Sequence, residues 1–183
     1  IAYQRISSCY ESLGNWASAI EYMDKAIMLD PDNDNYIQYK ANIYYEAGEI
    51  ETAISMMDEY VERRPDYGWG YYRRGWYKDN IHDIDGAIED YTTSIALDGD
   101  YPYVFVSRGQ MYLQKGDKDL AMKDFETVIQ IDTVAEDGSC TMYALMYLGR
   151  NEEAVEWMNK MLESSEEEGV RYDAREYIFP LSY

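Results

Sequence analysis

Histidine, cysteine, proline and basic residues are scarce in this sequence of 183 residues, which holds one His, two Cys and four Pro. Sixteen Lys and Arg stand against 36 Asp and Glu, so the formal net charge is −20. A field of this sign opposes docking onto phosphate backbones or anionic lipid, which excludes nucleic acid and membrane surfaces as favoured partners. No apolar run approaches the roughly 18 residues of a membrane span, so we expect a soluble protein.

Motifs for catalysis and metal binding are also missing. The single histidine, His82, has only scattered carboxylates beside it (Asp79, Asp83), which favours a solvated turn over a metal site. The acidic stretch from Asp30 lacks the glycine and the terminal glutamate of a calcium loop. No glycine-rich phosphate loop or nucleophile elbow occurs. The sequence therefore predicts no catalytic residue, no metal site and no cofactor.

What the chain does contain is a pattern that returns every 34 residues. Three residue types repeat at this spacing: Gly14 and Gly48, Ala19 and Ala53, Pro31 and Pro65. The alanines continue at Ala87, Ala121 and, slipped by one residue, Ala154, and the glycines at Gly116 and Gly149. A fixed period of this size indicates a tandem array of one supersecondary unit rather than a globular enzyme.

Each unit divides into two amphipathic helices. In the second unit, apolar residues at spacings of three and four predict helices over residues 36–47 and 51–63. Gly48 lies between them, because glycine takes the left-handed conformation that a helix stop requires. The alanine column suits a crossing at which two helix backbones approach to about 8 Å. The sequence predicts an all-α fold, an α-solenoid of tandem antiparallel helix pairs.

These columns are where the chain resembles the tetratricopeptide repeat family. The family's unit has a bulky residue, a small one four positions on and a tyrosine three later, then an alanine, a large residue, a small residue and a proline. The first unit supplies Tyr3, Ser7, Tyr10, Ala19, Met23, Ala26 and Pro31. The resemblance covers about residues 1–168 and implies a right-handed superhelix whose first helices line a concave groove that holds peptides. Departures are Lys78 for the tyrosine, His82 for the glycine, and Gly99 and Thr133 for the proline.

Residues 1–183 are predicted to form a single array. Its repeats are expected at about 1–33, 34–67, 68–101, 102–134 and 135–168, followed by a partial or capping helix at 169–183. Because each repeat contacts only its neighbours, Cys9 and Cys140 should not pair. The lack of a disulfide framework favours the cytoplasm, and a periplasmic or secreted protein after signal removal stays open.

Register predicts which side chains line the groove that the resemblance implies. This set is far less acidic than the whole chain and places Trp and Tyr rings beside an Arg, which is typical of binding hot spots. The alternative is that some of these rings pack between repeats. The predicted groove residues are Gln38, Tyr39, Asn42, Trp69, Tyr72, Arg73, Trp76, Tyr103, Ser107 and Gln110, and Tyr45 and Val106 share their register.

One specialisation of the family can be tested against these positions. Some members hold the C-terminal tail of heat-shock chaperones in a clamp of five side chains. Here only Arg73 matches the clamp, and Trp69 stands where its second lysine is expected. Capture of a chaperone tail is therefore not predicted.

Lys40, Arg74 and Arg108 form a basic column at exact repeat spacing. The column could be a ladder for an acidic ligand. The favoured interpretation is structural, because Asp90 and Asp124 each lie sixteen residues beyond an Arg and so on the facing helix of the same unit. A partly buried Arg–Asp pair that fixes helix register explains the column without a ligand.

The leading functional hypothesis is a protein–protein interaction scaffold whose groove takes a peptide segment of a partner, basic or neutral and with apolar anchors. Arg73, Asn42 and Gln110 would hydrogen-bond the peptide backbone. The alternative is a structural or self-association module within a larger chain or assembly, its groove filled by the same chain or by a homo-oligomer. An enzyme with its site in the groove is set aside, because the groove positions hold almost no nucleophile or titratable pair.

Overall fold

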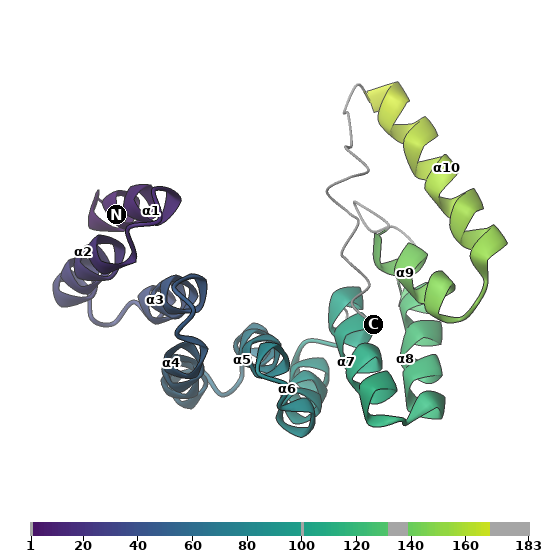
Figure 1. The fold of residues 1–183 in the computed structure, drawn as a ribbon, viewed down its shortest axis with the longest axis horizontal. Coiled ribbons are helices and arrows are strands. Elements are labelled where there is room, and N and C mark those ends of the chain that lie inside the picture. The colour runs from purple at the N-terminus through teal and green to yellow at the C-terminus, as the bar shows by residue number, and fades with distance from the viewer. Residues whose placement is uncertain (1, 100, 132–138, 169–183) are drawn as a thin grey trace. The chain divides into compact units, whose positions relative to one another are not determined.

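The computed structural model describes residues 2–99, 101–131 and 139–168. The predicted capping helix at 169–183 lies outside these ranges. Every regular element within them is an α-helix (Figure 1), and none of these helices has the length and apolar character to cross a bilayer. The helices are α1 (Ala2–Ser12), α2 (Trp16–Leu29), α3 (Asn35–Glu46), α4 (Ile50–Arg63), α5 (Gly68–Asn80), α6 (Ile84–Leu97), α7 (Pro102–Lys115), α8 (Lys118–Ile131), α9 (Ser139–Tyr147) and α10 (Asn151–Glu168).

The helices belong to two compact units, residues 1–99 with α1 to α6 and residues 100–183 with α7 to α10. In the first unit each helix packs against its neighbours in the chain, and α1, α3 and α5 lie along one side while α2, α4 and α6 lie along the other (Figure 1). In the second unit α7 packs on α8, α8 on α9, and α9 on α10. Turns of two or three residues join the paired helices, which makes each pair antiparallel. The predicted all-α fold of tandem helix pairs is confirmed.

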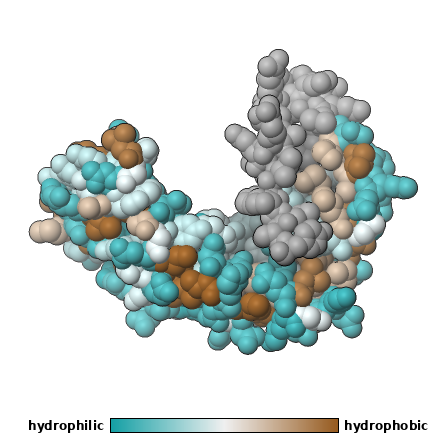
Figure 2. All heavy atoms as spheres, viewed as in Figure 1, coloured by the Kyte–Doolittle hydropathy of each residue, from teal (hydrophilic) through white to brown (hydrophobic). Residues whose placement is uncertain are grey.

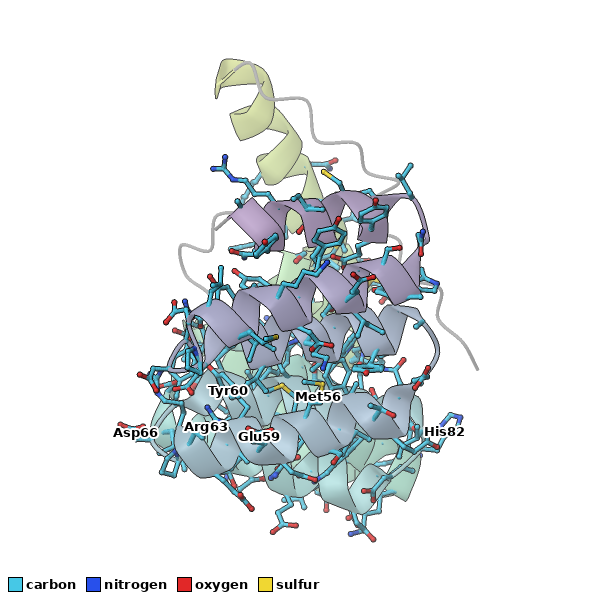
Figure 3. The ribbon with its side chains drawn as sticks, turned by 90° about the vertical axis from the view of Figure 1, so that its left-hand side faces the viewer. Met56, Glu59, Tyr60, Arg63, Asp66 and His82 are labelled. Carbon is cyan, nitrogen blue, oxygen red and sulfur yellow. The ribbon has the colours of Figure 1, made fainter. Side chains whose placement is uncertain are left out.

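The turn inside each helix pair uses one left-handed residue. Gly14, Gly48, Gly116 and Gly149 have φ of 68°, 84°, 92° and 72°. In the turn between α5 and α6 the same position is His82, with φ of 60°. Its side chain projects into solvent at the edge of the unit (Figure 3). A side chain in this conformation costs about 1–2 kcal/mol, so this turn is strained where the others are not.

The alanine column lies where the two helices of a pair cross. Ala19, Ala53, Ala87 and Ala121 are 0% exposed and Ala154 is 4% exposed. No larger side chain fits at so close a crossing. The positions that the period singled out are therefore the innermost of each pair.

A second packing rule links a small residue on the first helix to a bulky one on the second. In the third and fourth repeats the small residue is a glycine and the bulky residue is aromatic. A Cβ added to Gly75 would lie 3.0 Å from the Tyr91 ring, and one added to Gly109 would lie 2.7 Å from the Phe125 ring. The first two units pair a somewhat larger residue with a flexible one, Ser7 with Met23 and Ala41 with Met57. The volumes are complementary in all four units.

The packing between successive pairs shows the same compensation. Ala26 of α2 and Tyr36 of α3 share one core cluster. One repeat later the sizes are exchanged, because Tyr60 of α4 is fully buried and Gly70 of α5 lies beside it. A Cβ on Gly70 would lie 2.9 Å from two carbons of the Tyr60 ring. The large residue at a normally small position is thus matched by a glycine on the facing helix.

Candidate functional site

The candidate site is the face that α1, α3 and α5 present in the first unit, called here the first-helix face. A chain of hydrogen bonds crosses its three helices. Asn42 of α3 donates from Nδ2 to Glu11 Oε1 of α1 at 3.1 Å. Arg73 of α5 donates from Nη2 to Asn42 Oδ1 at 2.9 Å. The amide of Asn42 on α3 therefore joins the carboxylate of Glu11 on α1 to the guanidinium of Arg73 on α5, and it sets the orientation of both groups.

Arg73 lies against aromatic rings of its own helix. Its Nη2 also donates to the Tyr77 hydroxyl at 3.1 Å, and its guanidinium carbon lies 4.9 Å from the centre of the Trp76 ring. Tyr77 is fully buried, and burial raises the pKa of its hydroxyl against the opposing effect of Arg73. Among the described residues, Nε and Nη1 of Arg73 have no hydrogen-bond acceptor, so three N–H groups of a preoriented guanidinium are left for a ligand.

Trp76 packs between two repeats. Its ring centre is 4.5 Å from that of Tyr45 on α3, and the Tyr45 hydroxyl donates to Asn80 Oδ1 at 3.1 Å. Asn80 in turn donates from Nδ2 to the Trp76 carbonyl at 2.7 Å. Burial, reinforced by the charge of Glu46, raises the pKa of Tyr45. Trp76 is half-buried, so it holds α3 against α5 and also contributes to the surface.

The remaining predicted residues of this unit lie at the start of α5 and on α3. The ring centres of Trp69 and Tyr72 are 5.1 Å apart, and Tyr72 also contacts Tyr91 of α6 at 5.9 Å. Tyr39 is 46% exposed. The Nε2 of Gln38 is buried and has no hydrogen-bond partner among the described residues. An aromatic pair, an exposed phenol and an unsatisfied amide donor thus accompany Arg73.

Three predicted groove residues belong to the second unit, on α7. Gln110 donates from Nε2 to the Tyr147 hydroxyl of α9 at 3.0 Å. Tyr103 stacks on Tyr101 with ring centres 5.4 Å apart, and Ser107 is half-buried. Val106, which shares their register, is buried at 8% exposure. The hydrogen bond of Gln110 therefore holds α7 to α9.

The basic column is made of ion pairs, as the favoured interpretation held. Arg74 donates from Nε and Nη2 to the two oxygens of Asp90 at 2.9 and 2.6 Å, and Arg108 does the same to Asp124 at 2.8 and 2.7 Å. Both aspartates are buried, at 1% and 4% exposure. Arg74 also bonds Asp58 at 2.8 Å. Burial lowers the pKa of Arg74, but the bonds to Asp90 and Asp58 outweigh it and the net shift is upward.

Lys78, the departure from the tyrosine column, has its explanation in this cluster. Its Nζ lies 2.8 Å from Asp90 Oδ2, so the one buried carboxylate serves two cations. Lys40, the third member of the basic column, pairs instead with Asp24 of the preceding repeat at 2.6 Å. Because these cations are already paired, the column offers no free ladder to an acidic ligand.

The surface around these residues is mostly polar. On the side that Figure 2 shows, apolar side chains form separate groups within a hydrophilic surface. Among the residues that the structure describes, no three His, Cys, Asp or Glu side chains gather in a way that would hold a metal ion. Neither Cys9 nor Cys140 forms a disulfide, as the sequence predicted.

Comparisons with known proteins agree with this architecture. Two family models described as tetratricopeptide repeat match the sequence, one over residues 12–72 and one over residues 103–133. The TPR repeat-containing protein MJ1428 of Methanocaldococcus jannaschii is 23% identical in an alignment 156 positions long, which covers 78% of this chain and 27% of that protein. DnaJ homolog subfamily C member 7 of Homo sapiens is 24% identical over 123 residues, 67% of this chain and 19% of its own length. The chain thus spans less than a third of either curated relative.

Solved structures show the same fold. The crystal structure of MamA, 24% identical, superposes with a TM-score of 0.62 over 90% of this chain and 96% of its own. A tetratricopeptide repeat protein from Parabacteroides merdae, 16% identical, gives 0.67 over 89% and 65%. TTC0263 of Thermus thermophilus, 18% identical, gives 0.64 over 88% and 89%.

Arrays of this kind are in general scaffolds for protein interactions without catalytic activity of their own. The helix pairs, the left-handed turn residues, the buried alanines and the matching family models all lead to one assignment. The chain belongs to the tetratricopeptide repeat family.

Proposed function

We propose that this protein is a non-catalytic scaffold whose first-helix face holds an extended or helical peptide segment of a partner protein. The observation that carries the proposal is the state of Arg73. Asn42 and Tyr77 fix its guanidinium through Nη2, and three of its N–H groups remain for a ligand. A donor that is already ordered loses little entropy when it binds, so its hydrogen bonds contribute more to affinity.

The rings around Arg73 supply the apolar part of the site. Trp69 and Tyr72 form one half-buried aromatic pair, and Tyr39 adds an exposed ring on the neighbouring helix. Rigid rings of this kind gain burial area at low entropic cost.

The chemistry of the partner follows from charge. The chain carries a net charge of −20, whereas the first-helix face pairs Glu11 with Arg73 through Asn42. Basic or neutral segments with apolar side chains fit such a surface, because the general field attracts them and the local face does not repel them. The predicted residues of the second unit, Tyr103, Ser107 and Gln110, stay a separate prediction.

The proposal is tested by selecting binders from a library of random peptides and measuring their affinity by fluorescence anisotropy. Arg73→Lys keeps the positive charge but loses the planar set of donors, and Tyr39→Ala removes the exposed ring. We expect each change to weaken a selected peptide about tenfold or more, Arg73→Lys through one lost hydrogen bond to a charged group and Tyr39→Ala through the lost burial of a ring. The matched control is Met28→Ala/Leu29→Ala, which removes two apolar side chains that are 82% and 75% exposed at the end of α2.

Peptides that bind the parent and the control equally and lose affinity for both site variants support the proposal. A library without enriched peptides, or peptides insensitive to both site variants, would overturn it. Sedimentation of the parent at increasing concentration distinguishes the alternative function. A mass that rises with concentration in the parent but not in the Tyr39→Ala variant would indicate that the face binds a second copy of the chain.

A further inference from the structure

The second unit holds a cavity of about 380 Å³ between α8, α9 and α10. Its apolar lining comes from Ile129 of α8, Leu145 of α9 and Trp157 of α10, with Thr141 of α9 among them. Four charged side chains complete it: Glu153, Glu156 and Lys160 of α10, and Arg150 of the turn before α10. None of the predicted groove residues lines this cavity.

Repeat register shows what the equivalent space holds in the fourth repeat. Between the fourth and fifth repeats of the array the spacing is 33 residues, as the shifts from Gly116 to Gly149 and from Ala121 to Ala154 show. The turn glycines confirm the alignment, because Gly116 and Gly149 have left-handed φ of 92° and 72°. Every position of the fifth unit can therefore be compared with its counterpart in the fourth.

The same shift takes Arg108 to Thr141 and Asp124 to Trp157. In the fourth unit Arg108 makes two hydrogen bonds to the buried Asp124, and its guanidinium lies 5.7 Å from the centre of the Tyr112 ring. In the fifth repeat a short threonine stands in place of the arginine, and a tryptophan stands in place of the aspartate that the arginine bonds. The cavity lies next to the position where the other unit has an arginine side chain.

The chemistry of the lining suits the group that is missing. A tryptophan ring is the best aromatic partner for a guanidinium, and Trp157 is half-buried at the cavity wall. Ile129 and Leu145 offer an apolar surface for the methylene stem of an arginine, which packs along such surfaces while its head stays polar.

A carboxylate is also within the lining. Glu156 pairs with Lys160 at 2.9 Å, and both side chains are well exposed, at 68% and 65%. Such an exposed pair contributes little stability, so a ligand cation can replace Lys160 at little cost. Glu153 is less available, because Arg150 donates to both of its oxygens.

We propose that this cavity binds an arginine side chain of a partner protein. The methylene stem lies along Ile129 and Leu145, the guanidinium stacks on Trp157, and the Glu156 carboxylate accepts its hydrogen bonds. The partner thereby supplies an arginine next to Thr141, the position equivalent to Arg108 of the fourth repeat. This site is separate from the first-helix face and does not depend on the function proposed for it.

The test uses the whole chain, labelled with ¹⁵N and titrated with N-acetyl-arginine N-methylamide. The indole N–H signal of Trp157, assigned with a Trp157→Phe variant, should shift in a saturable way while those of the other three tryptophans stay in place. The norleucine analogue has a similar stem without charge and should give no saturable shift. The lysine analogue should bind more weakly than arginine, because it lacks the planar fork that matches a carboxylate.

Four variants locate the contacts. Glu156→Gln should weaken arginine binding about fivefold, the equivalent of one partly exposed charge pair, and Lys160→Gln should strengthen it by removing the competing cation. Glu152→Gln is the matched control, since it removes the same charge from the same helix without lining the cavity. Thr141→Arg should abolish binding, because the chain's own arginine would then fill the space.

Several outcomes would overturn the proposal. One is a norleucine analogue that shifts Trp157 as strongly as arginine does, because the cavity would then be a general apolar site. Another is an equal loss of affinity in Glu152→Gln and Glu156→Gln, because only the overall negative field would then be acting. The proposal would also be overturned if the indole N–H signal of Trp157 shows no saturable shift up to the solubility limit of the arginine probe.

Discussion

Replacement of Gly70 by alanine should destabilise the first unit because of one ring. The new Cβ would lie 2.9 Å from two carbons of the Tyr60 ring and 3.3 Å from Val61 Cγ1, and Tyr60 is 0% exposed and has no space to retreat into. Overpacking of a core costs about 1–3 kcal/mol. Alanine recovers about 1 kcal/mol of helix propensity relative to glycine. The net loss of unfolding free energy should therefore be about 1 kcal/mol.

The same replacement should change sign when the ring is removed. In a Tyr60→Ala background no ring opposes the Cβ, and Val61 Cγ1 at 3.3 Å can shift into the space that the ring leaves. The helix propensity then dominates, so Gly70→Ala should stabilise by up to about 1 kcal/mol. Tyr60→Ala alone should cost about 3–5 kcal/mol as a large core deletion. One repeat earlier, Ala26 and Tyr36 show the opposite arrangement of sizes, so Tyr60→Ala/Gly70→Tyr should regain part of this loss.

Urea unfolding followed by far-ultraviolet circular dichroism measures all four combinations, provided that the dependence on urea stays the same. The coupling free energy between the two sites should be about 1–3 kcal/mol, as for residues in direct contact. If Gly70→Ala has the same sign and size in both backgrounds, the glycine is not there to accommodate the ring. The account of size exchange between repeats would then be refuted.

Three further changes have directions that the structure determines. His82→Gly should raise the unfolding free energy by about 0.5–1 kcal/mol, because it relieves about 1–2 kcal/mol of left-handed strain and the entropic cost of glycine is smaller. Thermal unfolding measures this change, and a destabilised variant would contradict the prediction. Asp90→Ala should cost about 3–5 kcal/mol, since Arg74 and Lys78, each 17% exposed, lose their buried acceptor. Asp58→Ala removes an exposed partner of Arg74 and should cost less than about 1 kcal/mol. Equal losses in urea unfolding would contradict this. Burial raises the pKa of the Asp79 carboxyl above its ordinary value of 3.8, although the charge of His82 acts in the opposite direction. The folded state therefore binds the carboxyl proton more tightly than the unfolded state does. Stability is consequently lost as the pH rises from 3.8 through the folded pKa. Asp79→Asn should remove that loss, and its advantage over the parent should grow across this pH window in urea unfolding; a constant difference contradicts the assignment.

The helices were predictable because their signals are local. The sequence predicts helices over 36–47 and 51–63, and the structure has Asn35–Glu46 and Ile50–Arg63. Glycine indicates the turn and alanine indicates the helix crossing, and each of these signals depends on the conformation of only a few neighbouring residues. His82 was identified as a departure from the glycine column, but its left-handed φ of 60° shows that the turn keeps its conformation and strains the side chain instead.

The state of the site residues was not predictable from register alone. Register placed Asn42 and Arg73 on the face but assigned both to a ligand, whereas the structure bonds them to each other. A signal was present, because Glu11 to Asn42 and Asn42 to Arg73 are both separations of 31 residues, one period less three. Which polar groups satisfy one another depends on side-chain length and on the twist between neighbouring helices, and the sequence period contains neither.

The fifth repeat shows how departures at facing positions act together. The shift of 33 residues takes Gly109 to Met142 and Phe125 to Met158, so a bulky residue stands where the other units have a small one. Met158 is 38% exposed, whereas its counterparts Met23, Met57, Tyr91 and Phe125 are at most 2% exposed. Two long side chains at facing positions leave no room for the close approach of the other pairs. The fifth repeat lacks both the Arg–Asp pair of the third and fourth repeats and the small residue that lets the helices of a pair approach closely, and this combination explains why the cavity lies there.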